Sequence, residues 1–171
     1  MPFKLFRMID VQSVITLLTA GLLLIAAYGD VRTRRIPNML VLAVAALGLM
    51  RLTLAEDLTL ALFTIATAAA IFAIGLLLFW RGLLGGGDVK LTAAAVLLVG
   101  APALSLFLVA MSLFGLVVTL ATIAADCLMG RPATPDVSSG NDLGSRRTVP
   151  YGVAIAAGAV LTLAIQFPLS W

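Results

Sequence analysis

Hydrophobic and polar positions along this chain alternate in long blocks rather than residue by residue. Six apolar runs are separated by short polar or glycine-rich segments. Most of the runs are long enough to cross the roughly 30 Å apolar core of a bilayer as a helix. We therefore predict six helices, at residues 11–29, 37–54, 58–80, 88–100, 102–125 and 150–170. The predicted fold class is all-α, a polytopic membrane helix bundle of about six transmembrane helices.

Two of these apolar runs and one polar stretch have features that bear on the topology. The run 88–100 is short for a full crossing, so we expect it to begin below the membrane surface, with Asp88 in a recess. The first run follows Lys4 and Arg7, as in a signal peptide, but it is long enough to span and is interpreted as a retained helix. The hydrophilic stretch 126–148 is rich in Pro, Ser, Gly and Asn, which predicts a flexible loop. We predict one transmembrane domain, residues 1–171, with cytoplasmic loops at about 30–36, 81–88 and 126–148.

The composition excludes several classes of protein. The chain is 62% hydrophobic and only 11% charged, with a mean hydropathy of +1.15, which excludes an ordinary soluble domain. It has no histidine and a single cysteine, Cys127, so Ser-His pairs, HExxH zinc sites, CxxC sites and intrachain disulfides are all excluded. We predict no metal and no cofactor. Among the catalytic groups that hydrolyse peptides within a membrane, paired carboxylates are still available. A Ser-Lys dyad is the rival, and it is disfavoured because no serine lies near Lys90 in sequence.

The net charge of +3 reflects cations that set the membrane topology. It does not indicate a nucleic-acid-binding surface, because no basic stripe with interleaved aromatic residues is present. Cations accumulate in cytoplasmic loops. Placing the loops after the first, third and fifth helices in the cytoplasm, with both termini outside, puts eight cations inside and three outside. The inner set is Arg32, Arg34, Arg35, Arg81, Lys90, Arg131, Arg146 and Arg147; the outer set is Lys4, Arg7 and Arg51.

This topology brings two aspartates to the same end of the bundle. Asp30 ends the first predicted helix, and Asp88 begins the fourth. Carboxylates at bilayer depth are costly, and they mark functional sites by default. Asp30 lies at a helix C-terminus, where an acid has the unfavourable sign, whereas the helix dipole favours an ionised Asp88. Two adjacent carboxylates share a proton, so one can take a proton from water while the other polarises a peptide carbonyl. The sequence leaves open which aspartate takes which role.

The residues around Asp88 carry both a functional and a structural interpretation. Gly85, Gly86 and Gly87 precede it, and three glycines do not hold a stable helix. Their exposed backbone could pair with an extended peptide, as a sheet edge does. The alternative interpretation is a flexible turn with an aspartate that caps the next helix.

Two further polar segments accompany the aspartates. After Asp30, the arginines, Arg34 among them, are predicted to anchor the topology, Pro37 suits a first helical turn, and Asn38 can bond local backbone. Before the last helix, Pro150 and Gly152 mark a helix entry and Tyr151 suits the membrane interface. Small residues that follow predict close helix packing, with a role in a substrate groove left open; they are Ala154, Ala157 and Gly158.

The ordered set of motifs resembles a known family. An Asp followed by an Arg-rich stretch and IPN, then GxGD with Lys90 after it, then a late PYG helix are similar to the type IV prepilin leader peptidases, which are GxGD intramembrane aspartyl proteases. The six-span form resembles the short branch that serves tight-adherence (Flp-type) pili and, more distantly, archaeal preflagellin peptidases. The resemblance covers nearly the whole chain.

The resemblance implies a set of functional expectations. Asp30 and Asp88 would be the catalytic pair of a bacterial inner-membrane peptidase. Its substrate would be a prepilin with a short basic leader and an apolar helix, cut on the cytoplasmic side after a glycine, with pilus-assembly components as candidate partners. Longer members also methylate the new N-terminus and carry a cysteine-tetrad zinc region, which this chain lacks, so methylation is not expected. Supporting roles at the site fall to Gly85, Gly86, Gly87, Lys90, Arg34, Pro37, Asn38, Pro150, Tyr151 and Gly152.

Two alternatives come from other classes of protein. A proton-coupled transporter or channel would carry acids near the midplane and discontinuous helices in two related halves; no paired halves are visible in this sequence. A non-catalytic scaffold of a pilus-assembly or secretion machine has no need of two matched acids, although a decayed peptidase would have the same sequence pattern.

Overall fold

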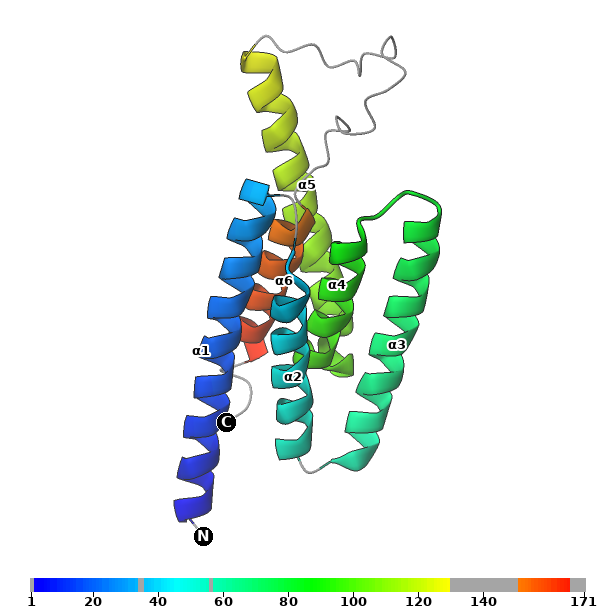
Figure 1. Cartoon of the computed structure of the whole chain (residues 1–171). Helices are drawn as coiled ribbons and strands as arrows, with labels where there is room; N and C mark the ends of the chain where they lie inside the picture. The colour runs from blue at the N-terminus through cyan, green and yellow to red at the C-terminus, as the bar shows by residue number, and fades with distance from the viewer. Residues whose placement is uncertain (1, 34–35, 56, 130–150, 167–171) are drawn as a thin grey trace.

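The computed structural model describes residues 2–33, 36–55, 57–129 and 151–166, and over these residues the chain is a bundle of α-helices with no strand. Six α-helices run antiparallel in sequence order (Figure 1). They are α1 (Pro2–Thr33), α2 (Asn38–Leu54), α3 (Leu58–Trp80), α4 (Gly86–Val99), α5 (Leu104–Leu128) and α6 (Tyr151–Gln166), with a short 3-10 helix η1 (Ala101–Ala103) before α5. The all-α prediction is confirmed.

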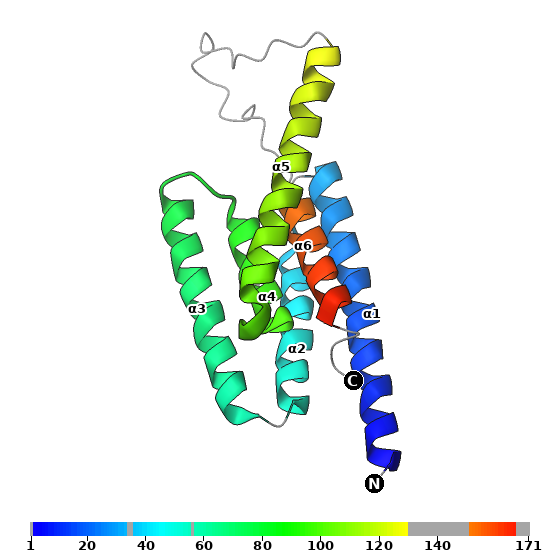
Figure 2. The same cartoon turned by 180° about the vertical axis from the view of Figure 1, so that it is seen from behind.

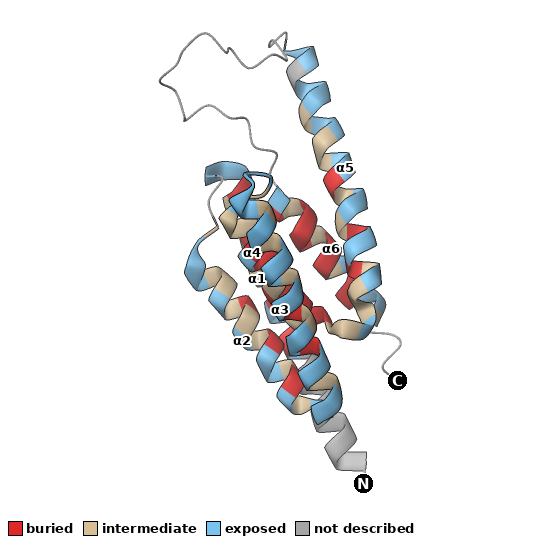
Figure 3. Ribbon diagram, turned by 90° about the vertical axis from the view of Figure 1, so that its right-hand side faces the viewer, coloured by how far each residue is buried: buried red, intermediate tan, exposed pale blue. Residues whose placement is uncertain are grey.

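The two shortest helices form the interior of the bundle. Helix α4 packs against α2, α3 and α6, and helix α6 packs against α1, α4 and α5. Half or more of the residues in each are buried, and α4 and α6 carry much of the red of Figure 3. The view from behind shows α5 lying over α6 and α4 (Figure 2). The site described below is built on these two interior helices.

The longer helices are apolar around their whole circumference and are mostly exposed. Among the residues that the structure describes, three segments are long and apolar enough to cross a membrane: Val14–Thr33, Leu58–Trp80 and Ala101–Ala125. Only 11% of the second and third of these is buried within the protein. A helix that is apolar all round yet exposed needs an apolar solvent, so the chain is a membrane protein.

Small residues allow the interior helices to approach their neighbours closely. A Cβ atom added to Gly48 of α2 would lie 2.9 Å from the backbone nitrogen of Leu98 on α4. A Cβ added to Gly158 of α6 would lie 2.8 Å from the backbone nitrogen of Met111 on α5. These approaches leave no room for a side chain, and they confirm the close packing predicted for the small residues of α6.

Helix α4 has 14 residues and is therefore about 21 Å long, shorter than the apolar core of a bilayer. Its C-terminal carbonyl groups must find donors within the protein. The guanidinium of Arg51 donates to the Leu98 carbonyl at 3.1 Å, and the amide of Gln166 donates to the Val99 carbonyl at 3.1 Å. These two side chains, from α2 and α6, fix the end of α4 that lies away from Asp88.

Several predicted boundaries were wrong. The first helix continues past residue 29 to Thr33, so Asp30 lies inside its last turn, because no helix-breaking residue intervenes before Pro37. The predicted loop at 30–36 is therefore helical in its first four residues. The predicted loop at 81–88 ends at Gly85, because α4 begins at Gly86. Helix α5 continues to Leu128, and most of the predicted loop 126–148 lies outside the described residues.

Candidate active site

The end of α1 and the beginnings of α4 and α6 meet at one end of the bundle (Figure 1). Asp30 lies in the last turn of α1 and is buried, with 6% of its surface exposed. The backbone N–H of Gly152 donates to its Oδ2 atom at 2.7 Å. Gly152 is the second residue of α6, so its N–H group has no acceptor within its own helix. The unfavourable position of Asp30 at the end of α1 is thus offset by the positive end of a different helix.

Gly152 permits this contact because it has no side chain. A Cβ atom at this position would lie 2.7 Å from Oδ2, 2.9 Å from Cγ and 3.0 Å from Cβ of Asp30. The last of these atoms is fixed to the backbone of α1 and cannot swing away. The glycine of the PYG motif therefore allows the start of α6 to approach the carboxylate, in addition to the packing role expected of this segment.

Asp88 is held within its own helix. Gly85 is the N-cap of α4, and Asp88 is the third helical residue. The backbone N–H of Gly85 donates to the Asp88 carboxylate, which is the contact that an acidic residue makes at this position of a capping box. A Cβ atom on Gly85 would lie 2.8 Å from Oδ2 of Asp88. Gly86 and Gly87 are helical, contrary to the expectation of a broken helix, because this cap offsets part of their conformational cost.

The two carboxylates interact through space. The charge of Asp30 acts on Asp88, although the two residues belong to different helices. Each carboxylate is also held by a main-chain N–H group at a helix N-terminus. Two carboxylates that act on each other through their charge can divide the roles of acid and base between them, which is the requirement for general acid–base chemistry.

The glycines before Asp88 are covered by apolar side chains from other segments. A Cβ atom on Gly86 would lie 3.3 Å from the ring of Phe79, at the end of α3. A Cβ atom on Gly87 would lie 3.5 Å from the side chain of Ile36, which precedes α2. The IPN motif includes Ile36 but does not indicate that it covers Gly87, and nothing in the sequence marked Phe79, because apolar residues are common throughout the chain and these partners are distant in sequence.

Two of the predicted supporting residues contact each other. The ammonium of Lys90 donates to Oδ1 of Asn38 at 3.1 Å, which joins α4 to the start of α2. Asn38 thus bonds another helix, whereas local backbone had been expected. Pro37 is exposed as the N-cap of α2, and its carbonyl accepts from the N–H groups of the first turn. Tyr151 is 42% exposed. Arg34 and Pro150 lie outside the described residues.

Within the described ranges, no three Asp, Glu or Cys side chains gather in a way that could hold a metal ion.

The sequence also matches a family model. Residues 17–120 match the model of the type IV leader peptidase family. This match covers more than half of the chain, and it includes both Asp30 and Asp88. The chain belongs to the type IV leader peptidase family. No curated protein and no solved structure matches it. The family membership identifies the chain as a leader-peptidase-like membrane protease, and α6, with Gly152, lies beyond the matched residues.

Proposed function

We propose that this chain is an aspartyl endopeptidase that removes the leader peptide of type IV prepilins of the Flp type, with Asp30 and Asp88 as its catalytic pair. The observation that carries the proposal is the pairing of these two carboxylates at one end of the bundle, each held by a helix N-terminal N–H group. Membership of the family supports the peptidase class. The acid–base chemistry of the pair supports the aspartic type.

The reaction follows from one proton shared between two carboxylates. The ionised aspartate takes a proton from a water molecule, whose oxygen attacks the scissile carbonyl carbon. The protonated aspartate donates to the carbonyl oxygen, so the tetrahedral intermediate is neutral. When this intermediate collapses, the carbon–nitrogen bond breaks, the leaving nitrogen takes a proton from one aspartate, and a hydroxyl group of the intermediate returns a proton to the other, which restores the pair. The leader leaves with a new carboxyl group, and the pilin gains a new amino terminus.

The proposed substrate suits a site at the end of a membrane bundle. A prepilin has a short basic leader followed by an apolar helix, so its cleavage point would lie at the membrane surface, after a glycine. The distribution of cations supports an orientation with the aspartate end of this bundle on the cytoplasmic side of a bacterial inner membrane. Pilus-assembly components are candidate partners of the processed product. Lys90, Asn38 and the glycines of α4 would support the site.

Co-expression with a candidate prepilin tests this proposal. We expect the wild-type chain to shorten the pilin on a denaturing gel, whereas Asp30→Asn and Asp88→Asn each abolish shortening. Asp57→Asn is the matched control. Asp57 lies at the opposite end of the bundle, where its side chain accepts from the N–H of Leu60 at 3.0 Å, and asparagine retains that acceptor. It should cleave as the wild type does.

Two results would count against the proposal. Cleavage by either active-site Asn variant at the wild-type rate would remove that aspartate from the catalytic pair. A wild-type chain that binds the prepilin without shortening it would favour the scaffold over the peptidase.

A further inference from the structure

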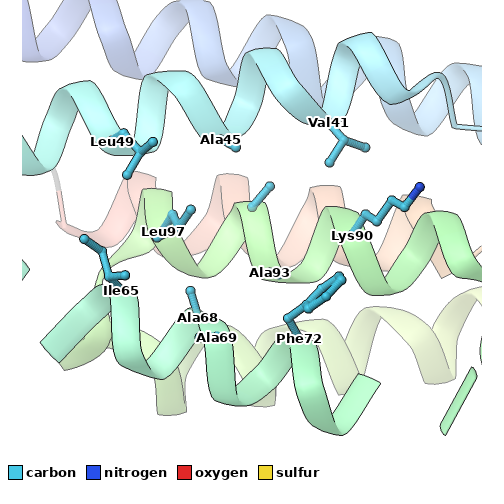
Figure 4. Close-up of a pocket in the computed structure, with 11 residues that line it drawn as sticks. Val41, Ala45, Leu49, Ile65, Ala68, Ala69, Phe72, Lys90, Ala93 and Leu97 are labelled. Carbon is cyan, nitrogen blue, oxygen red and sulfur yellow. The ribbon is translucent and has the colours of Figure 1, made fainter. Parts of the chain in front are cut away.

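A groove lies between α2, α3 and α4, on a side of α4 that the proposed catalytic pair does not use. It arises because α2 and α3 each pack on α4 and diverge from each other. We call it the α2–α3–α4 groove. It is lined by 11 residues and has a volume of about 340 Å³ (Figure 4). Among the lining residues only Lys90 is charged, and the other ten are apolar.

The groove opens toward the lipid-facing surface of the bundle. Its rim includes Leu49, Ile65 and Phe72, which are 46%, 43% and 39% exposed. Its walls and floor include several alanines, among them Ala45, Ala69 and Ala93. The hydrocarbon chains of membrane lipids therefore have direct access to this apolar groove.

The groove has a charged end and an apolar end. Lys90 lies beside Val41 and Phe72, whereas Leu97, Leu49 and Ile65 line the other end (Figure 4). Lys90 and Leu97 are seven residues apart on α4, so the groove is about 10 Å long. The charged end is also the end of α4 at which Asp88 lies, in the first turn. Asp88 and Lys90 are two residues apart, which places them about 200° apart around the helix axis.

The lining of the groove indicates its occupant. Ten of its 11 residues are apolar and it opens to the lipid-facing surface, so a hydrocarbon chain of the membrane suits it. An ammonium carries three N–H donors, so Lys90 can hold Asn38 and a phosphate oxygen together. A lysine near a bilayer surface also favours anionic lipids.

We propose that the α2–α3–α4 groove binds one acyl chain of an anionic phospholipid, with the headgroup phosphate on Lys90. The bound lipid fills the space between α2 and α3 and joins them across α4. This site is separate from the catalytic pair, and it does not depend on the identity of the substrate.

Lipid retention tests the site without any measurement of peptidase activity. The protein is reconstituted in nanodiscs of equal parts phosphatidylglycerol and phosphatidylcholine and extracted in mild detergent, and the lipids that remain bound are quantified by mass spectrometry. The wild-type chain should retain phosphatidylglycerol in preference. Ala69→Leu fills the groove and should lower retention of both lipids at least fivefold. Ala66→Leu, on an exposed face of α3 outside the groove, should leave retention unchanged.

Charge is tested separately from shape. Lys90→Gln should lower the retained phosphatidylglycerol roughly fivefold, the effect of one cation near an anionic surface, with phosphatidylcholine unchanged. Arg81→Gln is its control, because Arg81 is an exposed cation that follows the last residue of α3. Ala45→Leu fills the groove from α2 and serves as a second filler, should Ala69→Leu fail to fold.

Three outcomes would overturn the proposal. The first is equal retention by Ala66→Leu and a folded filler variant. The second is a Lys90→Gln chain that keeps the wild-type lipid preference. The third is a groove without lipid in which an Ala69→Cys variant cross-links to the apolar helix of a co-expressed substrate.

Discussion

The N–H group that holds Asp30 lies 122 residues further along the chain, whereas the N–H group that holds Asp88 lies three residues before it, at Gly85. Asp30 is buried at the end of its own helix and depends on the start of α6. Asp88 is half-buried and depends on the first turn of α4. In both cases a carboxylate accepts a hydrogen bond from an N–H group at a helix N-terminus. Tertiary packing brings this N–H group to Asp30, whereas the local sequence brings it to Asp88.

This difference predicts unequal sensitivity to mutation. A change at the α1–α6 contact alters the position of two helices, whereas a change at the α4 cap alters the end of one flexible side chain. The four predictions below test this contrast, from the largest expected effect to the smallest.

Gly152→Ala should have the largest effect. The added Cβ would overlap three side-chain atoms of Asp30, including its Cβ at 3.0 Å, so α6 or the carboxylate must move. A displacement of about 1 Å at a catalytic group can cost roughly a hundredfold in rate. We expect a loss of that size in the prepilin cleavage rate.

Gly115→Ala is the control for this substitution. A Cβ at Gly115 would meet Ala154 at 3.8 Å, an ordinary contact, and the cleavage rate should remain near wild type. A Gly152→Ala chain that cleaves as fast as Gly115→Ala would show that the α6 N–H group does not position Asp30.

Gly85→Ala should have a smaller effect. Its Cβ would meet only the end of the Asp88 side chain, at 2.8 Å from Oδ2, and that end can rotate away. Alanine is also a poorer N-cap than glycine, by roughly 1 kcal/mol at most. We expect about a tenfold loss of cleavage rate, measured in the same assay. A loss as large as that of Gly152→Ala would show that Asp30 and Asp88 are equally sensitive to changes at their N–H donors, which would contradict the predicted difference.

Arg51→Met tests how much the side-chain hydrogen bond at the far end of α4 contributes to stability. The substitution leaves the buried Leu98 carbonyl without its donor, which costs about 1–3 kcal/mol. We expect that decrease in the free energy of unfolding, measured by denaturing-detergent titration in mixed micelles. Arg51→Lys, which keeps an N–H donor, should lose less. Equal losses from both substitutions would mean that the hydrogen bond does not matter.

Asn38→Ala should have the smallest effect. It removes the exposed hydrogen bond to Lys90, and such bonds contribute on the order of 1 kcal/mol or less. The free energy of unfolding should fall by no more than this amount, and the cleavage rate by less than about fivefold. A complete loss of cleavage with the fold intact would instead give Asn38 a direct role at the site.

The sequence predicted the local features of this molecule better than the tertiary ones. The bounds of α3 were predicted correctly, because Asp57 caps its first turn and its apolar run ends at Trp80. The start of α4 was predicted two residues late. Three successive glycines disfavour a helix, but the hydrogen bond between Gly85 and Asp88 stabilises its first turn. That contact is local, and the spacing of Gly85 and Asp88 could have indicated it.

The partner of Asp30 could not be predicted in the same way. Apolar patterns identify helices but do not say which helices pack together when every face is apolar. The family resemblance gave the PYG segment a supporting role at the site, yet nothing in its residues indicates a hydrogen bond from Gly152 to Asp30. The side-chain donors at the end of α4 were missed for the same reason, because Arg51 and Gln166 are distant from Leu98 and Val99 in sequence.

The central claim is that Asp30 and Asp88 act as one catalytic unit, and a double-mutant cycle tests it most directly. Single-turnover cleavage rates of a prepilin would be measured for the wild type, Asp30→Asn, Asp88→Asn and the double variant in proteoliposomes. Residues that act as a unit have strongly non-additive effects, so the double variant should be no slower than the slower single variant. Losses that multiply in the double variant would show two independent contributions and would contradict the account.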